Sequence, residues 1–210
     1  MRRYTTAITA AVAAFVASTA VASAQHLHVV GQHDPWLAPA ERAISKQQPA
    51  VQSRWHTPRI KWTTNGWPVY IGTVAQLKRW HAYRPEVAYD PGYHKATVTW
   101  NGHKYVYHPF MVINMTVEKH NYERPSAVLN HEVDETLVDP TTQRFINGNE
   151  VEVCDPVYTS TYHGLGGVQL EDFVYPSYFH NRSHGPYDYL HVLKHGIGAA
   201  QLKAPDVVVP

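Results

Sequence analysis

The residues with the clearest potential for chemistry lie within one five-residue stretch, from His131 to Glu135. On a helix, His131 and Glu135 lie one turn apart on the same face, so both side chains could bind one metal ion. Glu132 is turned about 100° from that pair, close enough to reach a metal-bound water without binding the metal. This H-E-x-x-E spacing is a variant of H-E-x-x-H, in which the glutamate is the general base of a metallopeptidase. The spacing predicts a metal centre with Glu132 as its catalytic base.

The second metal-binding end of this motif is a carboxylate, Glu135, where H-E-x-x-H has a histidine. A carboxylate is an acceptable ligand for Zn²⁺, and it also suits harder ions such as Mn²⁺ or Ca²⁺, so we expect Zn²⁺ or another divalent metal. A third ligand is expected downstream. Glu152 and Asp155 are the best candidates, because these two carboxylates flank an apolar pair and lead into a turn; the others are Asp139, Glu150 and His163. The alternative interpretation is a solvated acidic helix face that happens to contain a histidine.

A helix must position these groups, and the sequence predicts one from Pro125 to about Val138. Proline suits the first helical turn, and Pro140 forces the helix to end. Residues at helical spacing mark the face opposite the metal-binding groups: Leu129, Val133, Thr136 and Leu137. One side of the helix should therefore pack on a sheet while the other side faces a cleft.

The remaining pattern predicts an α+β domain with few helices over residues 59–210. Asn-Gly turns indicate two hairpins, at 59–72 and 96–108, and a helix is expected at 73–83. Residues 110–117 form a further apolar strand. Residues 25–58 are rich in Pro, Gln and His and show weak periodicity, so we interpret them as an extended N-terminal arm with one short helix near 40–47.

Composition restricts the class of protein. The 210-residue chain has a formal net charge of +1, so nucleic acid is not an expected partner. A single cysteine, Cys154, excludes an intramolecular disulfide framework and is expected to be a small buried core residue. The chain also contains fifteen histidines, a number that is consistent with metal binding.

Residues 1–24 have the three parts of a secretory signal peptide: positive charges at Arg2 and Arg3, an apolar run over 10–17, and the cleavage site Ala22-Ser23-Ala24. We therefore expect a mature chain that starts at Gln25, has no membrane span and is secreted or periplasmic. The apolar run is too short to cross a bilayer.

Four ordered segments resemble a family of largely uncharacterised bacterial and phage proteins. They are H-E-x-x-E-x-x-x-D-P from His131 to Pro140, E-V-C-D-P from Glu152 to Pro156, D-F-V-x-P-x-x-F from Asp172 to Phe179, and the run from Gly185 to Leu190. The resemblance implies a zincin-like fold, in which a small mixed or antiparallel sheet packs on the metal-site helix. In zincin-type metallopeptidases an edge strand precedes this helix and pairs with extended substrate. We assign residues 110–117 to that edge strand.

Three functions are consistent with these features, and one of them is a sugar-binding or wall-binding protein that uses exposed Trp and Tyr side chains. The other two involve the predicted metal centre. The first is an exported metal-dependent hydrolase, foremost a zincin-like peptidase that acts on a peptide or protein. The second is a non-catalytic zincin-like structural or binding module on a cell surface, or on a virion if the chain is phage-encoded. The metal content of the purified protein, together with an activity assay, separates these hypotheses.

Overall fold

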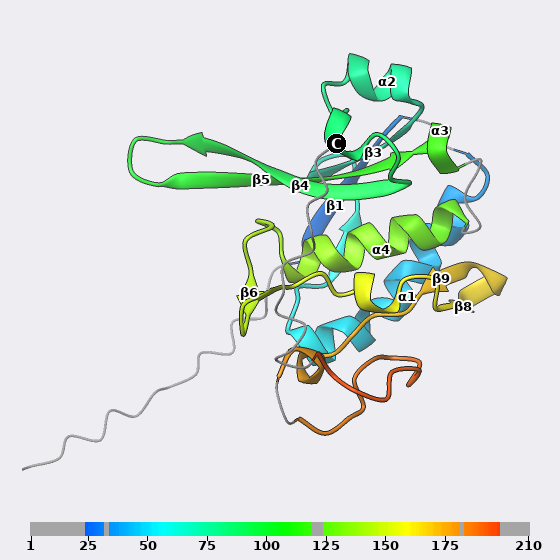
Figure 1. Cartoon of the computed structure of the whole chain (residues 1–210). Helices are drawn as coiled ribbons and strands as arrows, with labels where there is room; N and C mark the ends of the chain where they lie inside the picture. The colour runs from blue at the N-terminus through cyan, green and yellow to red at the C-terminus, as the bar shows by residue number, and fades with distance from the viewer. Residues whose placement is uncertain (1–23, 32–33, 119–123, 181–182, 198–210) are drawn as a thin grey trace, which may run out of the picture.

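The computed structural model describes residues 24–31, 34–118, 124–180 and 183–197, and shows a mixed α+β architecture (Figure 1). The predicted signal peptide, residues 1–24, lies outside the described residues apart from Ala24. Among the described residues, no helix combines the length and hydropathy that a bilayer span requires.

A five-stranded sheet with the order β2-β1-β3-β5-β4 organises the chain. Its strands are β1 (Gln25–Gly31), β2 (Ile60–Trp62), β3 (Trp67–Gly72), β4 (Gly92–Trp100) and β5 (Tyr105–Asn114). The first four strands in this order are parallel, and β4 runs antiparallel to β5 at one edge. The sheet is therefore mainly parallel with a single antiparallel edge strand.

Helices cover both faces of the sheet. The long helices α1 (Leu37–Trp55) and α4 (Pro125–Val138) lie on one face, while α2 (Val74–Arg79) lies on the other and α3 (Met115–Glu118) follows β5 directly (Figure 1). The largest hydrophobic core lies between the sheet and α1 and α4, around Ile44, Ile71 and Leu129. The remaining elements are short: β6 (Phe145–Ile146), β7 (Asn149–Glu150), β8 (Thr161–His163), β9 (Gln169–Glu171), and the 3₁₀ turns Pro85–Val87, Asp155–Val157, Leu165–Gly167 and Pro176–Phe179.

The expectation of an extended arm over residues 25–58 is wrong. This segment contributes β1, an interior strand, and the 19-residue helix α1. Its periodicity is weak in the sequence because the buried face of α1 contains small and polar residues, such as Ala40, Ala43 and Gln47, beside its larger apolar ones. Both elements belong to the folded domain, since Leu27 of β1 and Ile44 of α1 lie in its largest hydrophobic core.

The predicted hairpin over 59–72 is also wrong. β2 and β3 do not pair with each other, because β1 lies between them and pairs in parallel with both. Gly66, in the connection between β2 and β3, has a φ of 132°, and a Cβ there would overlap the backbone of His26 on β1. Glycine at this position therefore serves the close approach of the connection to β1.

The predicted hairpin at 96–108 is confirmed and is longer than expected, since the pairing of β4 with β5 extends to Gly92 and Ile113. Figure 1 shows that it projects well beyond the rest of the sheet. The assignment of 110–117 as the edge strand is wrong, since β5 lies between β3 and β4, and α3 begins at Met115. Because the hairpin folds β4 back along the outside of β5, the edge strand is β4.

Helices were predicted with better success. α4 spans Pro125–Val138, as the two prolines indicated. α2 starts after Thr73, whose backbone N–H donates to the Gln76 side chain, but it ends at Arg79, earlier than the predicted residue 83.

Candidate metal centre

The motif helix α4 is buried on almost all sides. Leu129, Val133 and Leu137 pack into the core, as predicted. The polar face is also covered, so Glu132 and Glu135 are only 4% and 3% exposed, and His131 is partly buried. The cover comes from β4, from β9 and from the segment before the turn Asp155–Val157, none of which is close to α4 in sequence. The acidic groups therefore lie inside the protein and not on a solvated helix face.

His131 is held between carboxylates on both sides of its ring. Its Nδ1 lies 3.1 Å from Oε2 of Glu171, a fully buried residue on β9. Its Nε2 lies 3.1 Å from Oε2 of Glu135 and 3.4 Å from Oδ1 of Asp155. A metal-binding histidine usually places its second nitrogen on such a carboxylate, which fixes the ring and raises its basicity. The arrangement leaves Nε2 as the nitrogen that faces a metal.

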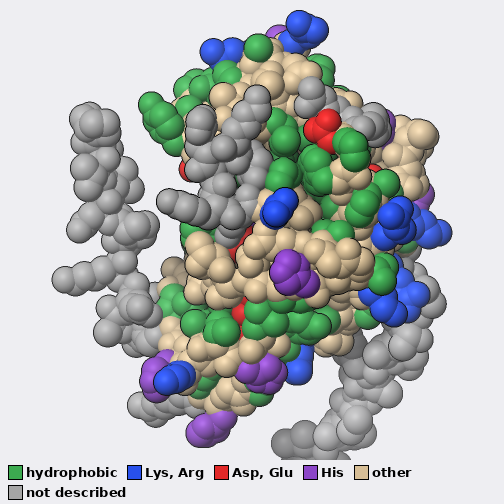
Figure 2. All heavy atoms as spheres, turned by 90° about the vertical axis from the view of Figure 1, so that its right-hand side faces the viewer, with side chains coloured by type: hydrophobic (Ala, Val, Ile, Leu, Met, Phe, Trp, Pro, Cys, Tyr) green, Lys and Arg blue, Asp and Glu red, His purple; other side chains and the backbone are tan. Residues whose placement is uncertain are grey.

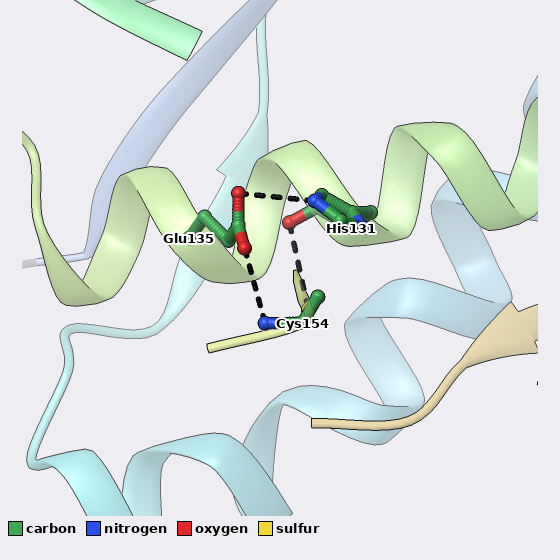
Figure 3. A group of neighbouring side chains, drawn as sticks. All are labelled: His131, Glu135 and Cys154. Atoms are coloured by element: carbon green, nitrogen blue, oxygen red, sulfur yellow. Dashed lines mark hydrogen bonds and ion pairs between the residues drawn. The ribbon is translucent and has the colours of Figure 1, made fainter. Parts of the chain in front are cut away.

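Glu135 is oriented by the backbone of the segment that faces it. Its Oε1 accepts hydrogen bonds from the backbone N–H groups of Cys154 (3.0 Å) and Asp155 (3.3 Å), which turns Oε2 toward His131. Figure 3 shows His131 and Glu135 on adjacent turns of α4 with Cys154 beside them. Cys154 is buried, as predicted, and its Sγ contacts the carbonyl oxygen of His131 at 3.8 Å.

A second histidine, which sequence reasoning did not single out, completes the cluster. His94 lies on the edge strand β4, is 8% exposed, and has Nδ1 3.5 Å from Oε2 of both Glu132 and Glu135. Its Nε2 lies 3.7 Å from Oε2 of Glu152. The cluster therefore unites β4, α4, β9 and the segment from Glu152 to Asp155.

The spacing between donor atoms suits bound metal. Ligand atoms about 2.0–2.1 Å from a tetrahedral ion lie roughly 3.3–3.4 Å from one another, which is close to the separations of 3.1–3.5 Å around Glu135 Oε2. Among the described residues, two sets of three groups lie close enough to hold an ion: His131, Glu135 and Cys154, and His94, Glu132 and Glu135. Glu135 belongs to both sets.

Charge in this cluster is strongly unbalanced. Burial by itself lowers the pKa of His94, but the surrounding carboxylates outweigh burial and raise it to about 9. The pKa of His131 is likewise well above its ordinary value despite burial, chiefly because of Glu135. Burial and the charge of Glu135 raise the pKa of Glu152 to about 9. At neutral pH the cluster thus retains protons, and a divalent cation would replace them as the compensating positive charge.

Lysine and arginine side chains do little to offset the negative charge of the carboxylates in this cluster. Of the described residues that line the adjoining cavity, only Lys95 is a Lys or Arg, and its Nζ lies 3.6 Å from Glu86. Figure 2 shows more Lys and Arg than Asp and Glu side chains among the described atoms of the face it presents. Seven of the described Asp and Glu residues are instead buried: Glu132, Asp134, Glu135, Asp139, Glu171, Asp172 and Asp188.

Several buried atoms of the cluster have no hydrogen-bond partner among the described residues. They are Nε2 of His94 and the carboxylate oxygens Oε2 of Glu132, Oε2 of Glu152 and Oε1 of Glu171. Burying a polar atom without a partner costs about 1–3 kcal/mol. Four such atoms in one cluster indicate that these residues are arranged for a ligand, and nitrogen and carboxylate donors fit a divalent cation.

The cluster lines a cavity of about 650 Å³ that is bordered by residues 90–95 on one side and by α4 on the other. β4 approaches α4 closely at Gly92, where a Cβ would lie 2.5 Å from Oε1 of Glu132 and 2.6 Å from Cγ1 of Val128. Glycine at this position lets the edge strand and the helix share the cavity.

A buried polar network fixes β9 and α1 against α4. The Asn130 side chain donates to Gln47 Oε1 (2.6 Å) and to Asp134 Oδ2 (2.9 Å), and its Oδ1 accepts the backbone N–H of Glu171 (2.8 Å). Gln48 donates to Asp134 Oδ1 at 2.7 Å. This network holds the Glu171 carboxylate in reach of His131.

Of the five residues predicted as possible third ligands, the structure places two in the cluster and three elsewhere. Glu152 and Asp155 lie in the cluster, as described above. Asp139 instead accepts backbone N–H groups of Thr141 and Arg144 in the loop after α4, Glu150 is exposed on β7, and Nδ1 of the exposed His163 contacts the carbonyl of Gly167.

Comparison with protein-family models, with curated proteins and with solved structures finds no match to this chain.

Proposed function

We propose that this protein is a metal-dependent hydrolase with a zincin-like architecture, and that its substrate is a polypeptide. The observation that carries the proposal is the placement of His131 Nε2, which lies 3.1 Å from Oε2 of the buried Glu135 and 3.4 Å from Oδ1 of the exposed Asp155, beside a cavity of about 650 Å³. A structural ion would not require a cavity beside it, whereas a catalytic ion needs an open position for water and substrate.

Zn²⁺ or another divalent metal would be held by His131 and Glu135, with Cys154 or Asp155 as the third donor and Glu152 near the same cavity. Such an ion supplies Lewis-acid polarisation of a carbonyl and lowers the pKa of a bound water. Glu171 would keep the metal-facing nitrogen of His131 deprotonated by accepting the proton on Nδ1. The carboxylate ligands keep Mn²⁺ among the suitable ions.

Glu132 has the position that the helix spacing predicts for a general base. It is the residue next to His131, its side chain lines the cavity, and its Oε2 has no hydrogen-bond partner among the described residues. Burial raises the pKa of Glu132, which brings a carboxylate closer to the pKa that suits proton transfer near neutrality. In a centre with one ion, Glu132 accepts the proton of the attacking water.

The edge strand favours a polypeptide over other substrates. β4 pairs with β5 on one side only, and residues 92–95 of β4 line the cavity. The unpaired edge of a strand offers peptide N–H and C=O groups that an extended chain can pair with. An extended polypeptide along β4 would pass directly over the cluster.

A binding module without catalysis is the second candidate. The tip of the β4–β5 hairpin favours it. There Trp100 and Tyr105 are 58% and 66% exposed, and the centroids of their rings are 5.1 Å apart. Aromatic side chains of this kind are enriched at protein interfaces.

One experiment separates the two candidates. The full chain is purified, its metal content is measured, and it is incubated with a diverse peptide pool, with and without a chelator. We expect chelator-sensitive cleavage, and for Glu132→Gln a loss of turnover of roughly 10²–10⁴-fold. The exposed Glu150→Gln is the matched control. Bound metal without cleavage would favour the binding module. A protein that binds no divalent metal would refute the metal-dependent hydrolase and leave the binding module in a metal-free form.

A further inference from the structure

The donor groups around Glu135 form two similar half-sites. In the first, Nε2 of His131 faces Glu135 Oε2, while its Nδ1 faces the carboxylate of Glu171. In the second, Nδ1 of His94 faces Glu135 Oε2, while its Nε2 faces the carboxylate of Glu152. Each histidine thus directs one nitrogen toward the same oxygen and the other toward a separate carboxylate, at 3.1 Å for His131 and at 3.7 Å for His94. A carboxylate behind the ring is the usual environment of a metal-binding imidazole.

Each half-site also has a further carboxylate beside the metal-facing nitrogen. Asp155 Oδ1 lies 3.4 Å from His131 Nε2, and Glu132 Oε2 lies 3.5 Å from His94 Nδ1. Among the described residues, the sets of three groups close enough to hold one ion are His131, Glu135 and Cys154, and His94, Glu132 and Glu135. Neither set contains both histidines, and both contain Glu135. The geometry therefore divides the donors between two positions with one common carboxylate.

A single ion at His131 leaves the second half-site uncompensated. His94 and Glu132 are more than nine-tenths buried, and Nε2 of His94 and Oε2 of Glu132 have no hydrogen-bond partner among the described residues. Five carboxylates surround the two histidines: Glu132, Glu135, Glu152, Asp155 and Glu171. Three of these carboxylates, Glu132, Glu135 and Glu171, are buried, and two divalent cations would offset their charge better than one.

We propose that the centre binds two divalent cations, one at His131 and Glu135 with Cys154 or Asp155 as the third donor, and the other at His94, Glu132 and Glu135, with Glu135 bridging them. The proposal rests on the proposed function for the first position and adds the second. Paired ions about 3.5–4 Å apart are used by aminopeptidases and phosphatases to stabilise both the attacking and the leaving oxygen. With the second position filled, Glu132 is a ligand, so its role as a general base belongs to the one-ion state.

The test counts ions. The full chain is stripped of metal, loaded with Mn²⁺, and titrated by calorimetry and by electron paramagnetic resonance. We expect two Mn²⁺ per chain, with a spin-coupled signal at two equivalents. His94→Gln should bind one Mn²⁺ and lose the coupled signal, and Glu135→Gln should weaken both positions. His103→Gln, at the exposed hairpin tip, is the control and should bind two.

The outcomes distinguish this proposal from the proposed function. If the wild type binds one Mn²⁺ and shows no coupled signal, the second position is refuted, whatever His94→Gln does, while the one-ion hydrolase stands. If the wild type binds none, both proposals fail. Circular dichroism checks that each variant folds, and if His94→Gln does not, the coupled signal of the wild type decides the question alone.

Discussion

The contact between His131 and Glu171 allows a direct test of how the metal centre is built. In Glu171→Gln the side chain keeps its shape and one oxygen, but it loses the negative charge that faces Nδ1 of His131 at 3.1 Å. The backbone N–H of Glu171 still donates to Asn130, so β9 should stay in place. The variant therefore changes the electrostatics of one contact more than its geometry.

The expected effect is a loss of metal affinity. Removing a partner behind a metal-binding histidine typically weakens binding by about 10–100-fold, which is about 1.4–2.8 kcal/mol. Glu171 is fully buried, so water does not screen its interaction with His131, and we expect a loss toward the upper end of that range. A neutral amide also cannot favour the Nδ1-protonated form of His131 as a carboxylate does.

The assay is competition for Zn²⁺ against a chromophoric chelator at a fixed pH. Glu150→Gln removes a carboxylate with the same substitution at an exposed position and should bind Zn²⁺ as the wild type does. If Glu171→Gln and Glu150→Gln both retain wild-type affinity while thermal melts show both folded, then Glu171 does not position His131 for metal and the reasoning is refuted.

Two further predictions concern stability. Gly92→Ala should lower the free energy of unfolding by about 1–3 kcal/mol. The reason is that the new Cβ would lie 2.5 Å from Glu132 Oε1 and 2.6 Å from Val128 Cγ1. A urea unfolding midpoint equal to that of the wild type would contradict this close approach. Burial, and then the neighbouring Asp188 carboxylate, raise the pKa of Asp172 from 3.8 to about 7. Between these two values the folded state holds a proton that the unfolded state has released, so stability should fall as the pH rises from about 4 to about 7 and level off above that. Asp172→Asn should remove this fall, because its amide carries no titrating proton, and urea unfolding at pH 5 and pH 8.5 measures the difference; equal pH dependence in the variant and the wild type would refute the assignment.

Local sequence determined the motif helix and the long hairpin. Pro125 and Pro140 fix the ends of α4 through backbone geometry, and the spacing of His131 and Glu135 fixes their common face. Asn101-Gly102 fixes the turn of the β4–β5 hairpin, with Asn101 Oδ1 accepting the N–H groups of His103 and Lys104. These features depend on neighbours within a few residues, so the sequence alone is enough to predict them.

Tertiary structure decided where the strands lie and which groups meet at the cluster. The sequence indicates strands near 60, 70 and 110, but the insertion of β1 between β2 and β3 depends on pairings between distant segments. His94 and Glu171 have no motif around them that marks a site, and they reach His131 and Glu135 only because β4 folds back along β5 and β9 packs on α4. Burial then decides their chemistry, since the same carboxylates on a solvated helix would need no cation to balance them.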